Sequence, residues 1–213
     1  MVLVYSDDKN ITIELLSKGK ELAKAMKKEL TAVNIGKDDY SKEYIAHGAD
    51  QVFIAETDLD TFKAEEFTDI LEKIIKETKS ETVLIGSNKN GKELAPRLAA
   101  RFATGCVTDC TDVYYKNNTF NAERIVYSGN GVAIEQFNSK PYIVTIPPKV
   151  FDPLPKDEKR SGKIIKKKID VKKTTSKIIK VQEMKTEGVN VEDAEIIVSC
   201  GRGFKNKQDI KLI

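Results

Sequence analysis

A strand, a polar loop and a helix follow one another between residues 81 and 113, and this unit most constrains what the chain can fold into. The apolar run 82–85 ends at Gly86, and the polar loop 87–91 precedes a stretch whose apolar residues recur at helical spacing. We expect the helix to end at Thr104 and Gly105, because glycine readily adopts the left-handed conformation that ends a helix. In an open α/β sheet, ligands or partners usually dock at such a loop.

The first 80 residues repeat this alternation of strands and helices. Amphipathic helices are expected from Ile11 and across residues 62–79, with Thr61 able to cap the second of them. The apolar strand candidates are residues 2–5, 31–35 and 51–55. Strands that alternate with helices of this length form right-handed crossovers. We therefore predict an α/β fold of three layers, an open and mostly parallel sheet with flanking helices.

Beyond Asp112 the pattern changes to short strands of alternating character. Asn117-Asn118 and the run 129–131 are turn signals typical of hairpins, so we predict an antiparallel β-hairpin region. The four strand candidates of this region are residues 113–115, 119–127, 133–137 and 142–146. Later candidates are residues 163–171 and 177–184, and a last buried strand at 195–199.

Charge and composition exclude several classes of protein. Isoleucines interleave with the lysine cluster at 166–168, as on an edge strand blunted by lysines, whereas a nucleic-acid surface interleaves aromatic residues. A net charge of +3 on 213 residues also gives little electrostatic attraction to nucleic acid or anionic lipid. No apolar run approaches the roughly 20 residues of a membrane span. The three cysteines form no disulfide framework, so we expect a cytoplasmic protein with neither a membrane span nor a nucleic-acid partner.

Few residues are candidates for chemistry. Cys106 and Cys110 lie close in sequence, but Cys200 and His47 are far from them, and a structural zinc needs four ligands. We expect no metal site and a structural or solvated His47. Cys106 and Cys110 are expected to act as small buried hydrophobic residues, with a reversible disulfide between them left open. No pair of nucleophile and base is recognisable, so we expect no catalytic residue and a non-catalytic protein.

The polar loops near the strand ends suggest helix caps. The loop 87–91 lacks the lysine-serine ending of a P-loop and a full GxGxxG pattern, so we expect an ordinary capped loop. A helix that starts there can still attract an anion. The pairs Asp7-Asp8 and Asp38-Asp39 are expected to cap or solvate their turns.

Two separated stretches together resemble one known family. The run IGSNKNGKELAPRLAARFATGCVTDCTDV resembles the N-terminal domain of the electron transfer flavoprotein α subunit. The terminal run AEIIVSCGRGFKNKQDIKLI resembles the opening of that subunit's FAD-binding domain, where a Val-Ser-Gly-Gly-Arg-Gly turn precedes a helix. The fold that this resemblance implies is Rossmann-like and similar to that of adenine-nucleotide alpha hydrolases.

The resemblance implies a cofactor and a partner. Family members pair as αβ heterodimers and carry electrons through FAD. Arg202, between Gly201 and Gly203, matches the arginine of the turn that lies against FAD. Cys200 stands in place of the usual first glycine, and Pro147 stands where an arginine is expected. The family's Ser-Arg pair, Gly-Gln-Thr-Gly loop and Gly-Ile-Ser-Gly segment have no counterpart here, so we expect that this chain alone does not bind FAD.

These observations give one preferred hypothesis for domains and function. Residues 1–187 are expected to form the α-subunit N-terminal-like domain, and residues 188–213 a linker and the vestigial start of an FAD-binding domain. The chain would be a truncated paralogue or half of a split subunit, acting as a scaffold with a β-like subunit and a separate FAD-domain chain. The alternatives are an adenine-nucleotide-binding α/β domain and a non-redox interaction scaffold. A homo-oligomer stays open.

Overall fold

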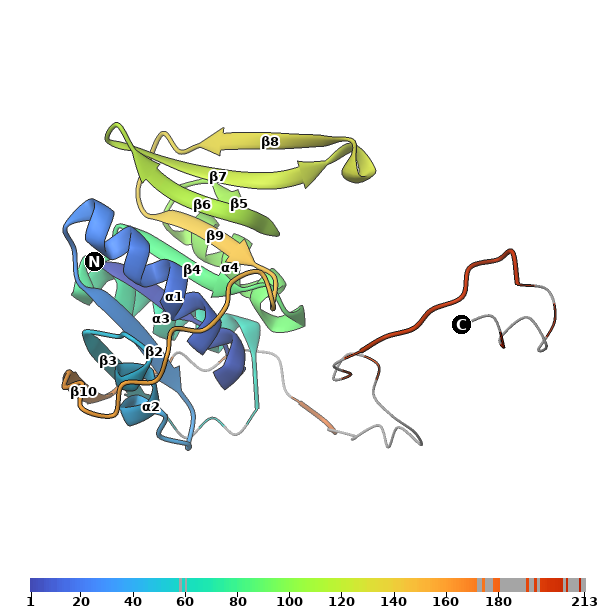
Figure 1. Cartoon of the computed structure of the whole chain (residues 1–213). Coiled ribbons are helices and arrows are strands. Elements are labelled where there is room, and N and C mark those ends of the chain that lie inside the picture. The colour runs from blue at the N-terminus through green and yellow to red at the C-terminus, as the bar shows by residue number, and fades with distance from the viewer. Residues whose placement is uncertain are drawn as a thin grey trace. The chain divides into compact units, whose positions relative to one another are not determined.

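The computed structural model describes residues 1–57, 59, 61–171, 174, 178–180, 191, 194, 196–204, 206 and 211. The chain forms two compact units, Met1–Thr174 and Thr175–Ile213. The larger unit contains two sheets (Figure 1). The domain boundary that we expect after residue 187 stays a prediction.

The larger sheet has seven strands in the order β10-β3-β2-β1-β4-β9-β5, and every neighbouring pair is parallel. Its strands are β1 (Val2–Tyr5), β2 (Leu30–Ile35), β3 (Gln51–Glu56), β4 (Thr82–Gly86), β5 (Cys106–Val107), β9 (Tyr142–Ile146) and β10 (Lys163–Lys168). The central strands are almost entirely buried, because helices cover both faces of a parallel sheet. The predicted, mostly parallel sheet is confirmed.

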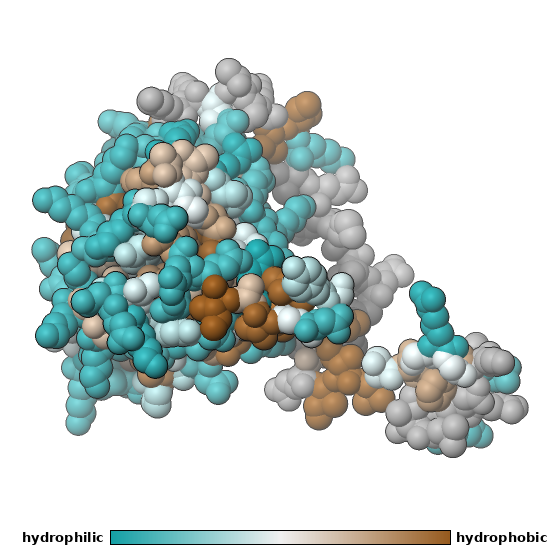
Figure 2. Space-filling model, turned by 90° about the horizontal axis from the view of Figure 1, so that it is seen from above, coloured by the Kyte–Doolittle hydropathy of each residue, from teal (hydrophilic) through white to brown (hydrophobic). Residues whose placement is uncertain are grey.

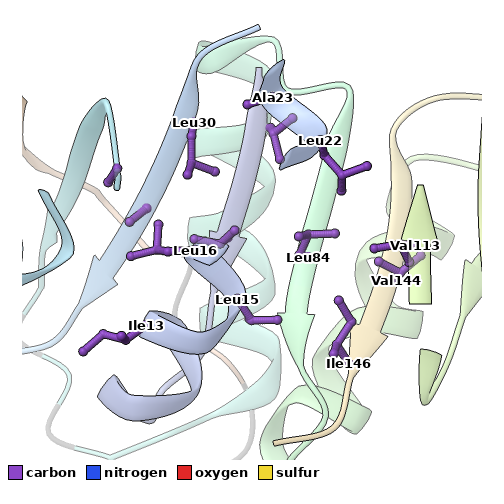
Figure 3. Packing of buried hydrophobic residues seen from close by; sticks show 14 of the residues in the cluster. Ile13, Leu15, Leu16, Leu22, Ala23, Leu30, Leu84, Val113, Val144 and Ile146 are labelled. Carbon is purple, nitrogen blue, oxygen red and sulfur yellow. The ribbon is translucent and has the colours of Figure 1, made fainter. Parts of the chain in front are cut away.

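Within the residues that the structure describes, four helices flank this sheet in two layers. They are α1 (Lys9–Met26), α2 (Ser41–Ala46), α3 (Ala64–Thr78) and α4 (Lys89–Arg101). Side chains alternate along β1, so that Val2 and Val4 pack with α1 and α2, whereas Leu3 and Tyr5 pack with α3 and α4. Figure 3 shows the first of these cores, where α1 lies over the strands. The three-layer α/β prediction is therefore confirmed.

The second sheet is antiparallel and has the order β6-β7-β8. Its strands are β6 (Cys110–Lys116), β7 (Thr119–Val126) and β8 (Gly131–Gln136), and the short 3-10 helix Tyr127–Gly129 joins the last two. One face of this sheet packs through Val113, Phe120 and Ala122, which belong to the same hydrophobic cluster as the buried residues of α1. In Figure 1 this sheet lies above β9, with β8 as its outer strand.

One strand was wrongly predicted as part of the hairpin region. Residues 142–146 form β9, which lies between β4 and β5 in the parallel sheet. Ile143, Val144 and Ile146 are fully or almost fully buried, as expected for a strand that is covered on both faces. The apolar run Tyr-Ile-Val-Thr-Ile carries this signal, but its choice of neighbours depends on contacts far along the chain.

Two predicted helix ends were also wrong. Thr61 does not cap α3; the N-cap is Lys63, and it makes no side-chain cap hydrogen bond. After α4, Ala103 rather than Gly105 adopts the left-handed conformation, with φ of 50°. The Thr104 N–H donates to the Ala99 carbonyl (3.0 Å), so the chain has already turned away before it reaches the glycine.

The later strand predictions were right in part. β10 is an edge strand, as the lysine pattern predicts, and it ends at Lys168. Its lysines form ion pairs, Lys166 with Asp39 (2.9 Å) and Lys167 with Glu77 (2.7 Å). Most of the candidate at 177–184 lies outside the described residues. At 196–199 the described residues form no strand, and Ile196, Ile197 and Val198 are exposed, so the predicted buried strand is wrong there.

Candidate functional site

The carboxyl edge of the large sheet is the first candidate site. The strand order reverses between β1 and β4, since β2 and β3 lie beyond β1 whereas β9 and β5 lie beyond β4. Ligands of open α/β sheets bind outside the carboxyl ends of the strands at such a switch point. Two loops meet there, residues 6–8 after β1 and residues 87–88 after β4.

A carboxylate of the chain itself lies against the start of α4. Asn88 and Asn90 donate side-chain N–H groups to the two oxygens of Asp7, at 2.6 and 2.5 Å. Asn88 also caps α4, because its Oδ1 accepts the Gly91 N–H (2.9 Å). The positive end of the helix dipole thus already has a negative partner, which disfavours an additional phosphate. The capped loop expected at 87–91 is confirmed.

A second polar cluster ties three segments together beside this loop. The Ser87 hydroxyl donates to Asp109 (2.5 Å) and lies 3.1 Å from the Thr145 hydroxyl, which accepts the Asp109 N–H (2.9 Å). Lys92 lies 3.1 Å from the same carboxylate. Burial raises the pKa of Asp109, but hydrogen bonds from Ser87 and Lys92 outweigh it, so the pKa is lowered. An ionised Asp109 is a structural tie and a poor proton acceptor.

The sequence contained weak signals for this cluster. In the sequence, Asp109 belongs to the family motif and lies beside Cys110, and neither position indicates a contact with Thr145. The two residues lie 36 positions apart, so no spacing rule links them. Asp109 has a φ of 55°, a conformation that aspartate tolerates better than most residues.

Cys106, Cys110 and His47 have structural surroundings. Cys110 is fully buried and Cys106 partly buried, and burial raises the pKa of these thiols to about 12 and about 11. Thiols with such pKa values stay protonated and react slowly. His47 Nδ1 lies 2.9 Å from the Leu154 carbonyl oxygen. Within the described part of the chain, no group of three or more possible ligands is arranged to hold a metal ion.

The outer face of the antiparallel sheet is the second candidate site. Ile125 pairs with Val132 across β7 and β8, and Ile134 lies two residues further along β8 on the same face. Their exposed fractions are 55%, 63% and 57%. Tyr127, at the turn, is 83% exposed and has a φ of 53°, which is rare for a bulky residue. We call Ile125, Val132 and Ile134 the apolar face.

The exposed hydrophobic residues of this sheet lie together, whereas single exposed hydrophobic residues are scattered over most protein surfaces. The view from above in Figure 2 shows hydrophobic side chains gathered among hydrophilic ones on the surface that β8 forms at the top of Figure 1. Such groups commonly mark sites where another protein binds. Sequence reasoning predicted the strands but not the apolar face, because alternation cannot tell which side of a hairpin packs on the protein.

The Gly201-Arg202-Gly203 turn is described within the smaller unit. The Phe204 N–H donates to the Gly201 carbonyl (3.2 Å), which closes the turn, and residues 201–204 are exposed. A Cβ atom added to either glycine would meet no atom within 4 Å. The assignment of these residues to FAD stays a prediction.

Comparison with known proteins adds independent information. A family model described as electron transfer flavoprotein domain matches residues 2–172. The chain is 33% identical to electron transfer flavoprotein subunit alpha of Clostridium acetobutylicum, over 94% of this chain and 63% of that protein. It is also 33% identical to the same subunit of Bacillus subtilis, over 94% of this chain and 62% of that protein.

A third relative is named as a subunit of a lactate dehydrogenase. The chain is 33% identical to the lactate dehydrogenase (NAD(+),ferredoxin) subunit LctC of Acetobacterium woodii, over 95% of this chain and 50% of that protein. The chain therefore spans between half and two thirds of the length of these relatives. Among the helices that the structure describes, none has the length and apolar character needed to cross a membrane.

Proposed function

Because this chain belongs to the electron transfer flavoprotein domain family, we propose that it is an α-type subunit that serves as a scaffold for FAD-dependent electron transfer. The proposal includes a β-like partner subunit. It excludes stable binding of FAD by this chain alone. The alternative of a non-redox interaction scaffold shares the partner and lacks the flavin.

The apolar face carries the proposal. Ile125, Val132 and Ile134 form one hydrophobic surface on a sheet whose other face is anchored in the core. A standard interface buries about 800 Å² per partner, so we expect the apolar face to be its centre and neighbouring polar residues its rim.

The binding test compares two isoleucines on edge strands. Ile134→Ser in β8 should weaken binding of a β-like subunit at least about tenfold, because it removes a central hydrophobic contact. Ile164→Ser is the matched control. Ile164 is 41% exposed and lies in β10, an edge strand of the larger sheet, whereas Ile134 lies in the antiparallel sheet. The dissociation constants are measured by calorimetry. Equal binding by the two variants and the wild type would contradict a partner site on the apolar face.

The expectation that this chain alone does not bind FAD rests on the small number of groups at the Gly201-Arg202-Gly203 turn that could contact the cofactor. The described turn offers one exposed guanidinium, Arg202, and an open backbone at Gly201 and Gly203. This fits a contact with one phosphate group of FAD but not the enclosure of a whole dinucleotide. We therefore expect FAD, which supplies the redox chemistry when bound, to need residues from another chain or domain.

A spectroscopic measurement tests this part separately. The purified chain is incubated with excess FAD, the unbound fraction is removed, and visible flavin absorbance is recorded. We expect no retained flavin from the chain alone and retained flavin once a β-like subunit and a flavin-domain chain are added. Arg202→Ala should then reduce retention, whereas Arg97→Ala, on an exposed face of α4, should not. Flavin retained by the chain alone would overturn the proposal.

An adenine nucleotide remains the other candidate ligand. The switch point between β1 and β4 is its expected position. The contacts of Asp7 with Asn88 and Asn90 place a carboxylate where the phosphate would need positive charge. This arrangement favours the subunit role over nucleotide binding.

A further inference from the structure

A cavity of about 760 Å³ opens at the carboxyl edge of the sheet, beside the switch point. Its lining comes from the ends of β1 and β2, the segment before α3, and the first turns of α3 and α4. The volume lies within the range that small-molecule sites occupy, about 300–1,000 Å³. Nothing in the proposed subunit role uses this cavity.

One side of the cavity is hydrophobic and partly aromatic. Ile35, Leu59, Phe62 and Phe67 line it, and the rings of Phe62 and Phe67 lie 4.9 Å apart with an interplanar angle of 53°. Aromatic rings of this arrangement provide a surface against which a flat ring can pack. The hydrophobic side thus selects for a planar, apolar body.

A buried hydroxyl without a partner belongs to the same hydrophobic cluster. Tyr5 ends β1, is 2% exposed, and packs in one cluster with Phe67, Phe62 and Ile35. Its hydroxyl makes no hydrogen bond among the described residues. Burial raises the pKa of Tyr5 well above its ordinary value, so the group stays a neutral hydroxyl. Hydrogen-bonding capacity is therefore unused in the cluster that forms the cavity wall.

The polar rim of the cavity carries more negative than positive charge. Asp7 and Asp38 contribute carboxylates, and Lys37 contributes one ammonium group. Asn88 and Asn90 hold the Asp7 carboxylate in place, and Asp38 accepts the Tyr40 hydroxyl (3.0 Å). Carboxylates accept hydrogen bonds from amino groups and repel phosphates. The rim therefore selects for a ligand that donates hydrogen bonds.

We propose that this cavity binds a flat heteroaromatic amine that carries no phosphate group. The ring packs against Phe62 and Phe67, and the amino group donates to Asp7 at the rim. The proposal goes beyond the subunit role and does not depend on it, because the apolar face lies on the antiparallel sheet and the cavity on the parallel one.

Three related probes test the chemistry on the full chain by titration calorimetry. Adenosine has the ring and the amino group, purine riboside lacks the amino group, and adenosine monophosphate adds a phosphate. We expect adenosine to bind saturably, and each of the other two to bind at least about tenfold more weakly. Absence of saturable adenosine binding, or equal or tighter binding of the monophosphate, would overturn the proposal.

Two variants of cavity residues test whether adenosine binds in this cavity. Asp7→Asn should weaken adenosine binding and narrow its advantage over the monophosphate, and Phe62→Ala should weaken all three probes. Glu158→Gln is the control, since Glu158 lines a different cavity beside α2. Thermal unfolding of each variant checks that the fold is kept. Adenosine binding that neither Asp7→Asn nor Phe62→Ala changes would place the ligand elsewhere and overturn the site, whatever the result with the partner subunit.

Discussion

At the residue scale, Gly91 decides whether the helix α4 can approach the sheet. A Cβ atom at this position would lie 1.8 Å from the Gly86 carbonyl oxygen, a backbone atom that cannot move aside. Helix propensity alone favours alanine over glycine by about 1 kcal/mol. We expect the steric clash to outweigh the gain in helix propensity, so that Gly91→Ala lowers the free energy of unfolding by about 2 kcal/mol or more.

Urea denaturation measures this effect against a matched glycine. Gly131→Ala places its Cβ at an ordinary 3.4 Å from the Val126 side chain, so this variant should change stability by less than about 1 kcal/mol. If Gly91→Ala were as stable as the wild type, the close approach of the α4 backbone to the end of β4 would not hold in solution.

At the element scale, a buried lysine orients the antiparallel sheet on α1. Lys18 is 7% exposed, and its ammonium lies 2.9 Å from Asp112 of β6 and 2.9 Å from Glu21. Burial lowers the pKa of Lys18, but hydrogen bonds to Asp112 and Glu21 outweigh it, so the pKa is raised and the charge is kept. The tie lies at the register shift between Cys110 and Asp112 in the pairing of β6 with β7.

Removing this tie should loosen one sheet and leave the other unchanged. We expect Asp112→Asn to speed amide hydrogen exchange in β6, β7 and β8 several-fold, because Lys18 then loses the carboxylate that ties α1 to β6. Exchange in β1 and β4 should stay as in the wild type. Glu123→Gln, on the neighbouring strand, is the control for loss of one negative charge. Uniformly faster exchange throughout the protein would contradict a local role for the tie.

At the scale of the whole molecule, Glu81 joins three segments at the amino edge of the sheet. Its carboxylate lies 3.0 Å from Lys28 and 2.5 Å from Lys140, and its backbone bonds to Met1 and Tyr142. The hydrogen bonds from Lys140 and Lys28 lower the pKa of Glu81 to about 2. A carboxyl group whose pKa falls on folding stabilises the folded state above its unfolded pKa, about 4.3, and loses this effect as the pH falls towards 2.

The pH dependence of stability tests this linkage. Glu81→Gln should be less stable than the wild type at neutral pH, by about 1 kcal/mol or less because the pair is partly exposed. The difference should shrink as the pH is lowered from about 5 to 2, since the wild-type carboxylate becomes protonated. Glu158→Gln, whose side chain is 78% exposed, is the control. A difference that stayed constant with pH would contradict the lowered pKa.

Local sequence patterns predicted most of the helices and strands. The wrong assignments concern which strands pair with one another, and this depends on contacts between distant segments. The four strands and the three longer helices that begin in the first 100 residues were found because periodicity and turn residues act over neighbouring positions, whereas the short helix α2 was missed. Residues 142–146 were assigned to the wrong sheet, because an apolar strand carries no mark of which strands flank it. The contact between Asp7 and Asn90 joins residues 83 positions apart, and no sequence spacing predicts it.

The sequence by itself determined the α/β class and the family. Alternating strand and helix periods, together with the motif around residues 88–109, are properties of neighbouring residues and can be read without coordinates. Only the tertiary structure decided that β9 enters the parallel sheet, that Asp7 faces the start of α4, and that Ile134 lies exposed. The physical reason is that burial and hydrogen-bond pairing depend on which distant segments meet, and the packing of the whole chain chooses among them.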